Sequence, residues 1–163
     1  MKGRGFSLVE LVVIISIISI LLTVGTISYN SWQVKYNVEK QTKEMLADLT
    51  TLRLQAIHTK KPIRLSLQTG NYAFKMYSSE AELTNFPGSG DVVLSKNLTY
   101  QIKRGDGSDI SGTTIDFDRS GIINNVQIIS ITSPNNNAAA DCLSISTALI
   151  NMGKMEDGSC KIK

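Results

Sequence analysis

The chain has 163 residues, enough for one ordinary domain and a membrane segment. Lys2 and Arg4 precede the apolar start, and without them the 17 basic residues become 15, against 14 acidic ones. That balance excludes the clustered positive charge expected of a nucleic-acid-binding surface. The single histidine, His58, excludes a histidine-rich metal site, and we expect neither metal nor cofactor.

An apolar segment follows the short basic leader, residues 1–5. Between Phe6 and Val24, 19 residues carry one charged side chain, Glu10. As a helix they measure roughly 28 Å, close to the thickness of a bilayer's hydrocarbon core. We therefore expect residues 6–25 to form a transmembrane helix, and later the core of a filament. No A-x-A-like cleavage site follows Val24, so this segment should remain on the protein.

The orientation of the segment follows from its basic leader, which places the N-terminus in the cytoplasm by the positive-inside rule. The residues beyond the segment then lie in the periplasm. Glu10 needs a specific role, because a carboxylate inside an apolar segment is costly.

The helical pattern continues as an amphipathic helix over residues 26–59. Its apolar stripe comprises Val34, Val38, Met45, Leu49, Leu52 and Ala56. Glu39 and Lys43 are spaced as an i,i+4 ion pair. Pro62 disfavours helical geometry in the residue before it, so one helix should run from about Phe6 to His58.

After Pro62 the apolar period changes to two, which predicts a β-rich domain over residues 60–163. Residues 63–67 and 72–77 predict a hairpin around the turn at residues 69–71. Residues 78–90 predict a loop, and no second helix is evident. Further strands are expected at residues 92–94, 98–103, 114–118, 122–132 and 142–150. The expected fold class is α+β, with one long N-terminal helix packed on an antiparallel sheet or sandwich.

The string Gly-Phe-Ser-Leu-Val-Glu at residues 5–10, followed by an uninterrupted apolar helix, resembles the processing site of type IV pilins and type II secretion pseudopilins. The resemblance implies that a prepilin peptidase cleaves between Gly5 and Phe6 and methylates the new N-terminus at Phe6. Glu10 then matches the family's glutamate at the fifth mature position. The implied partners are that peptidase, other filament subunits, an assembly platform in the inner membrane, and the inner membrane itself.

Physical chemistry gives Glu10 a role in filament assembly. Cleavage creates an ammonium group on Phe6, and the Glu10 carboxylate of a neighbouring subunit is its natural counter-charge. Buried between subunits, such a pair sets axial register, because a misplaced subunit leaves both charges unpaired. Alternatively, Glu10 only stabilises the positive end of its own helix dipole.

The later chain is similar to GspH/FimT-like minor pseudopilins and minor pilins. Phe117 to Gly121 resembles that family's F-x-x-x-G turn, in which glycine permits a tight strand connection. A closing strand at residues 142–146 also fits. Many pilins carry a proline near the end of the membrane segment, whereas Ile27 occupies that region here.

Cys142 and Cys160 are expected to form a disulfide, because the domain should lie outside the cytoplasm. Two free structural thiols are the alternative. Asp106 and Asp109 lie in a glycine-rich loop, where some major pseudopilins bind calcium. Their spacing departs from that of an EF-hand, and Asp and Gly are turn formers, so we expect a turn.

We expect a structural subunit, a minor pilin or pseudopilin, and not an enzyme. The chain has no G-x-S-x-G motif, and His58 is expected to face solvent at the helix end. One alternative is a FimT-like minor pilin that binds DNA for natural transformation. The comparable stretch, residues 147–154, has no arginine, so DNA is a possible partner that we do not favour. Another alternative is a monomeric, membrane-anchored binding module.

Overall fold

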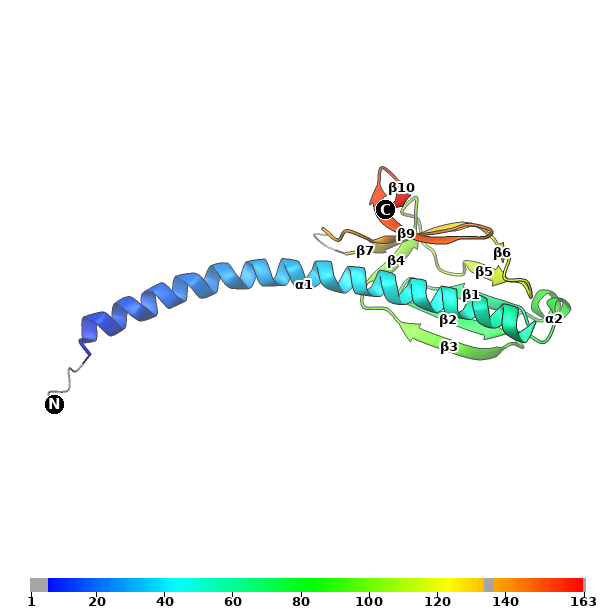
Figure 1. The fold of residues 1–163 in the computed structure, drawn as a ribbon, viewed down its shortest axis with the longest axis horizontal. Helices are drawn as coiled ribbons and strands as arrows, with labels where there is room; N and C mark the ends of the chain where they lie inside the picture. Colours follow the sequence, from blue (N-terminus) through cyan, green and yellow to red (C-terminus); the bar gives the residue numbers. More distant parts are fainter. Residues whose placement is uncertain (1–5, 134–136, 163) are drawn as a thin grey trace.

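The structure is a computed structural model that describes residues 6–133 and 137–162, apart from the side chains of residues 24–28. The leader, with Gly5 of the expected cleavage site, lies outside the described residues. The first element, α1 (Leu8–Thr59), has 52 residues and is therefore about 78 Å long. Figure 1 shows that its N-terminal part projects away from the rest of the molecule, whereas its C-terminal part packs along the β-rich domain.

The ends of α1 agree with the helix predicted over residues 6–58. Ser7 precedes the helix in an extended conformation, with φ −75° and ψ 142°. Lys60 ends it in the left-handed conformation, with φ 57° and ψ 32°, two residues before Pro62. Helices commonly end in this way, with a left-handed residue and a proline soon after it.

The projecting part of α1 exposes apolar side chains. Those of Leu8, Val9, Ile20 and Leu21 are each at least 66% exposed. Among the described residues, no helix combines the length and apolarity required to cross a membrane. The transmembrane span over residues 6–25 therefore stays a prediction.

Ten strands of the described chain form two antiparallel sheets. The first sheet has the order β3-β2-β1-β5-β6, built from β1 (Ile63–Leu67), β2 (Asn71–Met76), β3 (Asp91–Asn97), β5 (Thr114–Phe117) and β6 (Ile123–Asn124). The second has the order β10-β9-β8-β7-β4, built from β4 (Gln101–Arg104), β7 (Gln127–Thr132), β8 (Cys142–Ile145), β9 (Ile150–Glu156) and β10 (Ser159–Ile162). The expected α+β fold class is confirmed.

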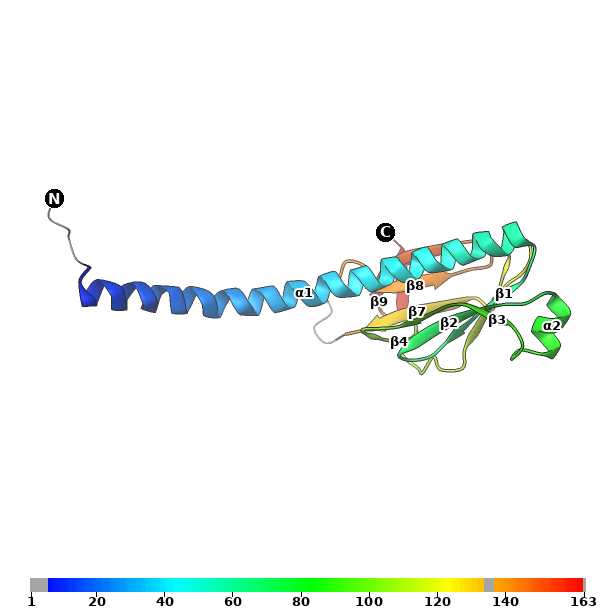
Figure 2. The same cartoon turned by 90° about the horizontal axis from the view of Figure 1, so that it is seen from below.

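The predicted apolar stripe holds α1 against the sheets. Val38, Met45, Leu49, Leu52 and Ala56 are buried, and Val34 is half-buried. The five buried residues pack in one core with residues of both sheets, including Leu65, Phe74, Ile115, Phe117, Leu143 and Ile145. Figure 2 shows that both sheets lie on the same side of α1. The opposite side of the helix is open.

The expectation of a plain loop over residues 78–90 is wrong, because α2 (Glu80–Asn85) forms within it. Ser79 caps this helix, accepting a hydrogen bond from the Glu82 backbone N–H at 3.2 Å. Ser79 and Glu82 are spaced as a capping box, so the signal was present in the sequence.

Two of the predicted strands are shorter than expected. Residues 122–132 divide into β6 and β7, because Asn125 lies between them with φ 68°, a left-handed conformation that interrupts a strand. Residues 142–150 divide into β8 and the start of β9, joined by a turn in which the Ser146 N–H donates to the Leu149 carbonyl at 2.9 Å. β9 and β10 then form a closing hairpin.

Candidate filament-assembly site and the helix–domain junction

Glu10 lies in the first turn of α1, and its side chain is exposed. Ser7 and Glu10 have the spacing of a capping box, yet Ser7 makes no side-chain capping bond. The preceding Phe6 is 68% exposed. The structure therefore places both residues of the expected intersubunit pair at the free end of the helix, where a second chain can reach them.

Three hydroxyls of the projecting segment are satisfied within the helix itself. The hydroxyls of Ser16 and Ser19 donate to carbonyls four residues earlier, each at 2.7 Å, and that of Thr23 does so at 2.8 Å. Such bonds are characteristic of Ser and Thr in apolar surroundings. Glu10 is the one side chain from Phe6 to Val34 that is charged at neutral pH, so it determines the electrostatics of this segment.

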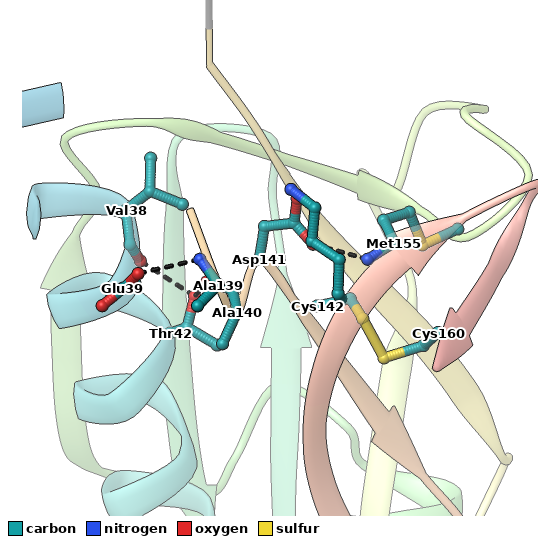
Figure 3. A network of polar contacts seen from close by, with 10 residues as sticks. Val38, Glu39, Thr42, Ala139, Ala140, Asp141, Cys142, Met155 and Cys160 are labelled. Atoms are coloured by element: carbon teal, nitrogen blue, oxygen red, sulfur yellow. Dashed lines mark hydrogen bonds and ion pairs between the residues drawn. A yellow bond between two sulfur atoms is a disulfide. The ribbon is translucent and has the colours of Figure 1, made fainter. Parts of the chain in front are cut away.

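Hydrogen bonds from polar side chains of α1 join the helix to the domain where it reaches the sheets. The Gln41 amide donates to the Tyr100 carbonyl at 2.8 Å and accepts from the Tyr100 N–H at 2.9 Å. The Glu39 carboxylate accepts from the Ala139 N–H at 2.8 Å, as Figure 3 shows. Glu39 thus bonds to the domain. The i,i+4 ion pair on this part of α1 is formed by Lys40 and Glu44, at 3.8 Å.

A second junction is centred on Asp48 of α1. Its Oδ2 accepts from the Tyr72 hydroxyl and pairs with Lys96 Nζ, both at 2.6 Å. Burial of the phenol, followed by its hydrogen bond to Asp48, raises the pKa of Tyr72 far above its ordinary value. This junction fixes β2 and β3 to the helix.

A third junction lies at the C-terminal end of α1. Arg53 donates from Nε to the Gly121 carbonyl at 2.7 Å and from Nη1 to the Ala148 carbonyl at 2.6 Å. Gly121 has φ +75°, and a Cβ there would lie 2.5 Å from Ile57 Cδ1. The tight strand connection predicted at Gly121 is confirmed, because a short turn joins β5 to β6 there, with the Gly121 N–H donating to the Asp118 carbonyl at 2.9 Å.

The expected disulfide between Cys142 and Cys160 is present, and it joins β8 to β10 across β9. A Cβ at Gly153 of β9 would lie 2.2 Å from the Lys161 carbonyl oxygen and 3.1 Å from Cys160 Sγ, so glycine is required there. Beside the disulfide, Asp141 is 3% exposed. Its carboxylate accepts from the Met155 N–H at 2.6 Å, as Figure 3 shows. It also accepts from Lys154 Nζ at 2.8 Å.

The aspartates considered for calcium form turns. Asp106 accepts from the Ser108 N–H at 2.9 Å, and Asp109 accepts from the Ser111 N–H at 3.0 Å. Hydrogen bonds from Ser108 hold the pKa of Asp106 below its ordinary value, and those from Ser111 and Thr69 do the same for Asp109. No group of three or more metal-ligating side chains occurs in the described part of the chain.

The remaining candidates are placed as follows. His58 is exposed near the end of α1, as predicted. Lys154, the basic residue of the stretch considered for DNA binding, pairs with buried Asp141. Because its ammonium group is paired with a carboxylate, Lys154 gives no support to a DNA-binding surface.

Sequence reasoning did not single out Gln41, Asp48 or Arg53 as junction residues, or Asp141 as a buried charge. Gln41 and Thr42 do lie on the buried side of α1, and Gln41 is 7% exposed. A polar residue within an apolar stripe is a signal for a specific hydrogen-bonding partner, since burial without one is costly. The partner itself lies 59 residues away in the sequence and could not be identified.

A long, partly projecting N-terminal helix packed on antiparallel sheets defines a pilin-like architecture. Residues 1–26 match the family model for the prokaryotic N-terminal methylation motif. This is the motif of the type IV pilin and type II secretion pseudopilin superfamily, whose members are structural rather than enzymatic. It implies processing by a prepilin peptidase, an N-terminal helix anchored in the membrane before assembly, and assembly with other pilins.

Comparisons with the curated proteins and with the solved structures found no significant match. The motif covers the N-terminal part of the chain and does not distinguish a GspH/FimT-like subunit from other members, or a minor from a major subunit.

Proposed function

We propose that this chain is a minor pilin or pseudopilin of the GspH/FimT-like type, in a type IV pilus or a type II secretion filament. It is made as an inner-membrane precursor with residues 60–163 in the periplasm. Cleavage between Gly5 and Phe6 releases the leader, and Phe6 becomes N-methylated. The observation that carries the proposal is the methylation motif over residues 1–26, which ends within the projecting part of α1.

The helix has two successive environments in this proposal. Before assembly, residues 6–25 lie in lipid as a single-pass anchor. During assembly the segment leaves the lipid and packs beside other subunits, so its apolar side chains remain covered in both states. The Glu10 carboxylate of one subunit then neutralises the Phe6 ammonium of a neighbour. Two unlike charges in an apolar surrounding strongly favour the register in which they meet.

The GspH/FimT-like assignment is supported by the turn from Phe117 to Gly121. Gly121 has φ +75°, and the Asp118 carboxylate accepts from the N–H groups of Ser120 and Ile122, both at 2.8 Å. The surrounding architecture, in which the long helix is followed almost entirely by strands, supports the same assignment.

Mass spectrometry of the chain from the producing bacterium tests the processing step. The expected species begins at Phe6 and carries one additional methyl group. A chain that keeps Met1 in cells with an active prepilin peptidase would contradict the proposal and favour a monomeric anchored module.

The role of Glu10 is tested by Glu10→Ala, with Ser16→Ala as the matched control on the same helix. We expect Glu10→Ala to be cleaved normally but to be poorly incorporated into filaments, whereas Ser16→Ala should behave as the wild type. Normal incorporation of Glu10→Ala would refute the argument from register.

A further inference from the structure

A cavity of about 150 Å³ opens where α1 passes the connection between β3 and β4. One wall is formed by residues of α1, among them Asn37 and Lys40. The facing wall includes Lys96 and Asn97 at the end of β3, and Thr99 of the connection. Sites for drug-sized ligands usually measure about 300–1,000 Å³, so this cavity is of a size for one small ring.

The charges around the cavity cancel. Lys96 Nζ pairs with Asp48 Oδ2 at 2.6 Å, and Lys40 pairs with Glu44 at 3.8 Å. Each ammonium group thus has its own carboxylate close by. An anion bound here would be repelled by these carboxylates about as strongly as it is attracted by the ammonium groups. The charge balance therefore favours a neutral ligand.

Three polar side chains of the cavity have unused hydrogen-bonding capacity. Among the described residues, Asn37, Asn97 and Thr99 make no side-chain hydrogen bond, although Asn37 is half-buried. An amide offers donors and an acceptor together, and a hydroxyl can do either. Such groups on two facing walls match a ligand that carries several hydroxyls, because each of those both donates and accepts.

The walls themselves are held by bonds that a ligand does not need to break. Gln41, 7% exposed, is bonded in both directions to Tyr100, at 2.8 and 2.9 Å. The Tyr72 hydroxyl, also at the cavity, donates to Asp48 at 2.6 Å. The free amides and the hydroxyl are therefore carried on a fixed frame, which lowers the entropic cost of binding.

An exposed aromatic ring lies beside the cavity. Lys40 and Glu44 also line a second depression of about 180 Å³, which Tyr36 borders. The Tyr36 ring stacks on Trp32 at 5.7 Å between centroids and remains 54% exposed. The C–H groups of a sugar ring suit the negative face of such an aromatic ring.

We propose that the cavity binds one neutral sugar ring, and that the next ring of the same glycan packs on Tyr36. An extended peptide is disfavoured, since it requires a long groove or a sheet edge rather than a compact cavity. The inference goes beyond the proposed function and does not depend on filament assembly. Two sources offer this chemistry, a cell-wall glycan with acetamido groups and a neutral surface polysaccharide without them.

Nuclear magnetic resonance titration of the full-length chain, in a phosphocholine detergent that carries no sugar, tests the site. The probes are chitobiose, with acetamido groups, and cellobiose, maltose and lactose, without them. The observed signals are the side-chain NH₂ groups of Asn37 and Asn97. At the affinity per atom that is typical of ligands, we expect a Kd of the order of 1 mM for at least one probe.

The outcomes separate the possible ligands. Binding of chitobiose in preference to the other sugars would support the cell-wall source, and the reverse order would support the surface polysaccharide. Unchanged signals with all four sugars at tenfold above that Kd would overturn the inference. Tighter binding of inorganic phosphate, or of an alanine-asparagine-alanine tripeptide, would overturn it as well.

Variants test the side chains. Asn97→Ala and Thr99→Val should each raise the Kd about two- to tenfold, as expected for one lost hydrogen bond. Asn124→Ala is the matched control, because Asn124 is an exposed asparagine in β6, at the opposite edge of the same sheet. Equal Kd values for Asn97→Ala and Asn124→Ala would refute the assigned site.

The second position has its own test. Tyr36→Ala should remove the advantage of a disaccharide over its monosaccharide while leaving the Kd of the monosaccharide unchanged. An undiminished advantage would overturn the contact with Tyr36. A chain that is processed and incorporated normally but binds no sugar would refute this inference alone, whereas a chain that keeps Met1 would refute the proposed function.

Discussion

Gly121 gives the sharpest test of how the domain is held on the helix. Its φ of +75° is costly for any residue with a Cβ, by roughly 1–2 kcal/mol. A Cβ at this position would also lie 2.5 Å from Ile57 Cδ1 and 2.7 Å from Ile57 Cγ1. Forcing that contact should add about 1–2 kcal/mol, in the range of overpacked cores. We therefore expect Gly121→Ala to lower the free energy of unfolding by about 2–4 kcal/mol.

Gly112 provides the matched control, because its φ is +77° and nothing lies within 4 Å of a Cβ built there. Gly112→Ala should show the backbone cost alone. Urea unfolding of the full-length chain in detergent, followed by near-UV circular dichroism, measures both. Adding Ile57→Ala to Gly121→Ala should recover part of the loss, since it removes the atoms that the new Cβ meets. Equal losses for Gly121→Ala and Gly112→Ala would refute the contact argument.

Three further predictions concern other junctions of the domain. Reduction of the Cys142–Cys160 disulfide should lower the free energy of unfolding by about 3 kcal/mol. Under native conditions it should also speed amide hydrogen exchange in β10, whereas exchange in β1 of the other sheet should stay slow. Unchanged exchange in β10 would contradict this prediction. The Glu82 carboxylate accepts from the hydroxyls of Ser78 and Ser89 and from the Ser78 N–H, and these bonds lower its pKa. Its contribution is therefore present at neutral pH and is lost as the pH falls through the depressed pKa, so proteolysis of the loop over residues 78–90 should increase in acid. Glu82→Gln should abolish that pH dependence, and persistence of the dependence would point to another group. Tyr72→Phe should cost about 1–2 kcal/mol and leave the absorbance titration near pH 10 unchanged, because the Tyr72 phenol stays protonated while exposed tyrosines ionise. A smaller absorbance change near pH 10 in the variant than in the wild type would contradict the buried Tyr72–Asp48 bond.

The course of the helix could be predicted because its signals are local and repeated. The stripe from Val34 to Ala56 has one period throughout, and Pro62 marks where that period ends. The β1–β2 hairpin could also be predicted from the sequence, because two segments of alternating apolar and polar residues flank a short turn. Each of these features depends on residues that are close together in the sequence.

Features that depend on distant residues or on a single backbone angle could not be predicted from the sequence. Asn125 divides residues 122–132 through its left-handed conformation, and although Asn adopts that conformation more readily than most residues, Asn124-Asn125 does not by itself fix where a strand ends. Gln41 and Tyr100 form a mutual pair over 59 residues of sequence, so their partnership follows only from the folded chain. The closing hairpin of β9 and β10 depends on Gly153, whose missing side chain makes room for β10.

The candidate assembly site was predicted more fully than the domain because its motif is short and contiguous. Gly5, Phe6 and Glu10 were identified from six consecutive residues, within the segment that matches the methylation motif. Their expected partner belongs to another chain, however. Its contacts therefore cannot follow from one chain, whether from the sequence or from the fold.

The hydroxyl bonds inside α1 have a consequence for how the helix changes its surroundings. Ser16, Ser19 and Thr23 each direct a proton to a carbonyl of their own helix, at 2.7–2.8 Å. The segment can consequently exchange a lipid neighbour for a protein neighbour without breaking or making a hydrogen bond at these positions. In the proposed function, the electrostatic difference between the two surroundings then falls on the Glu10 carboxylate and the Phe6 ammonium group, so these two charges determine when the helix leaves the lipid.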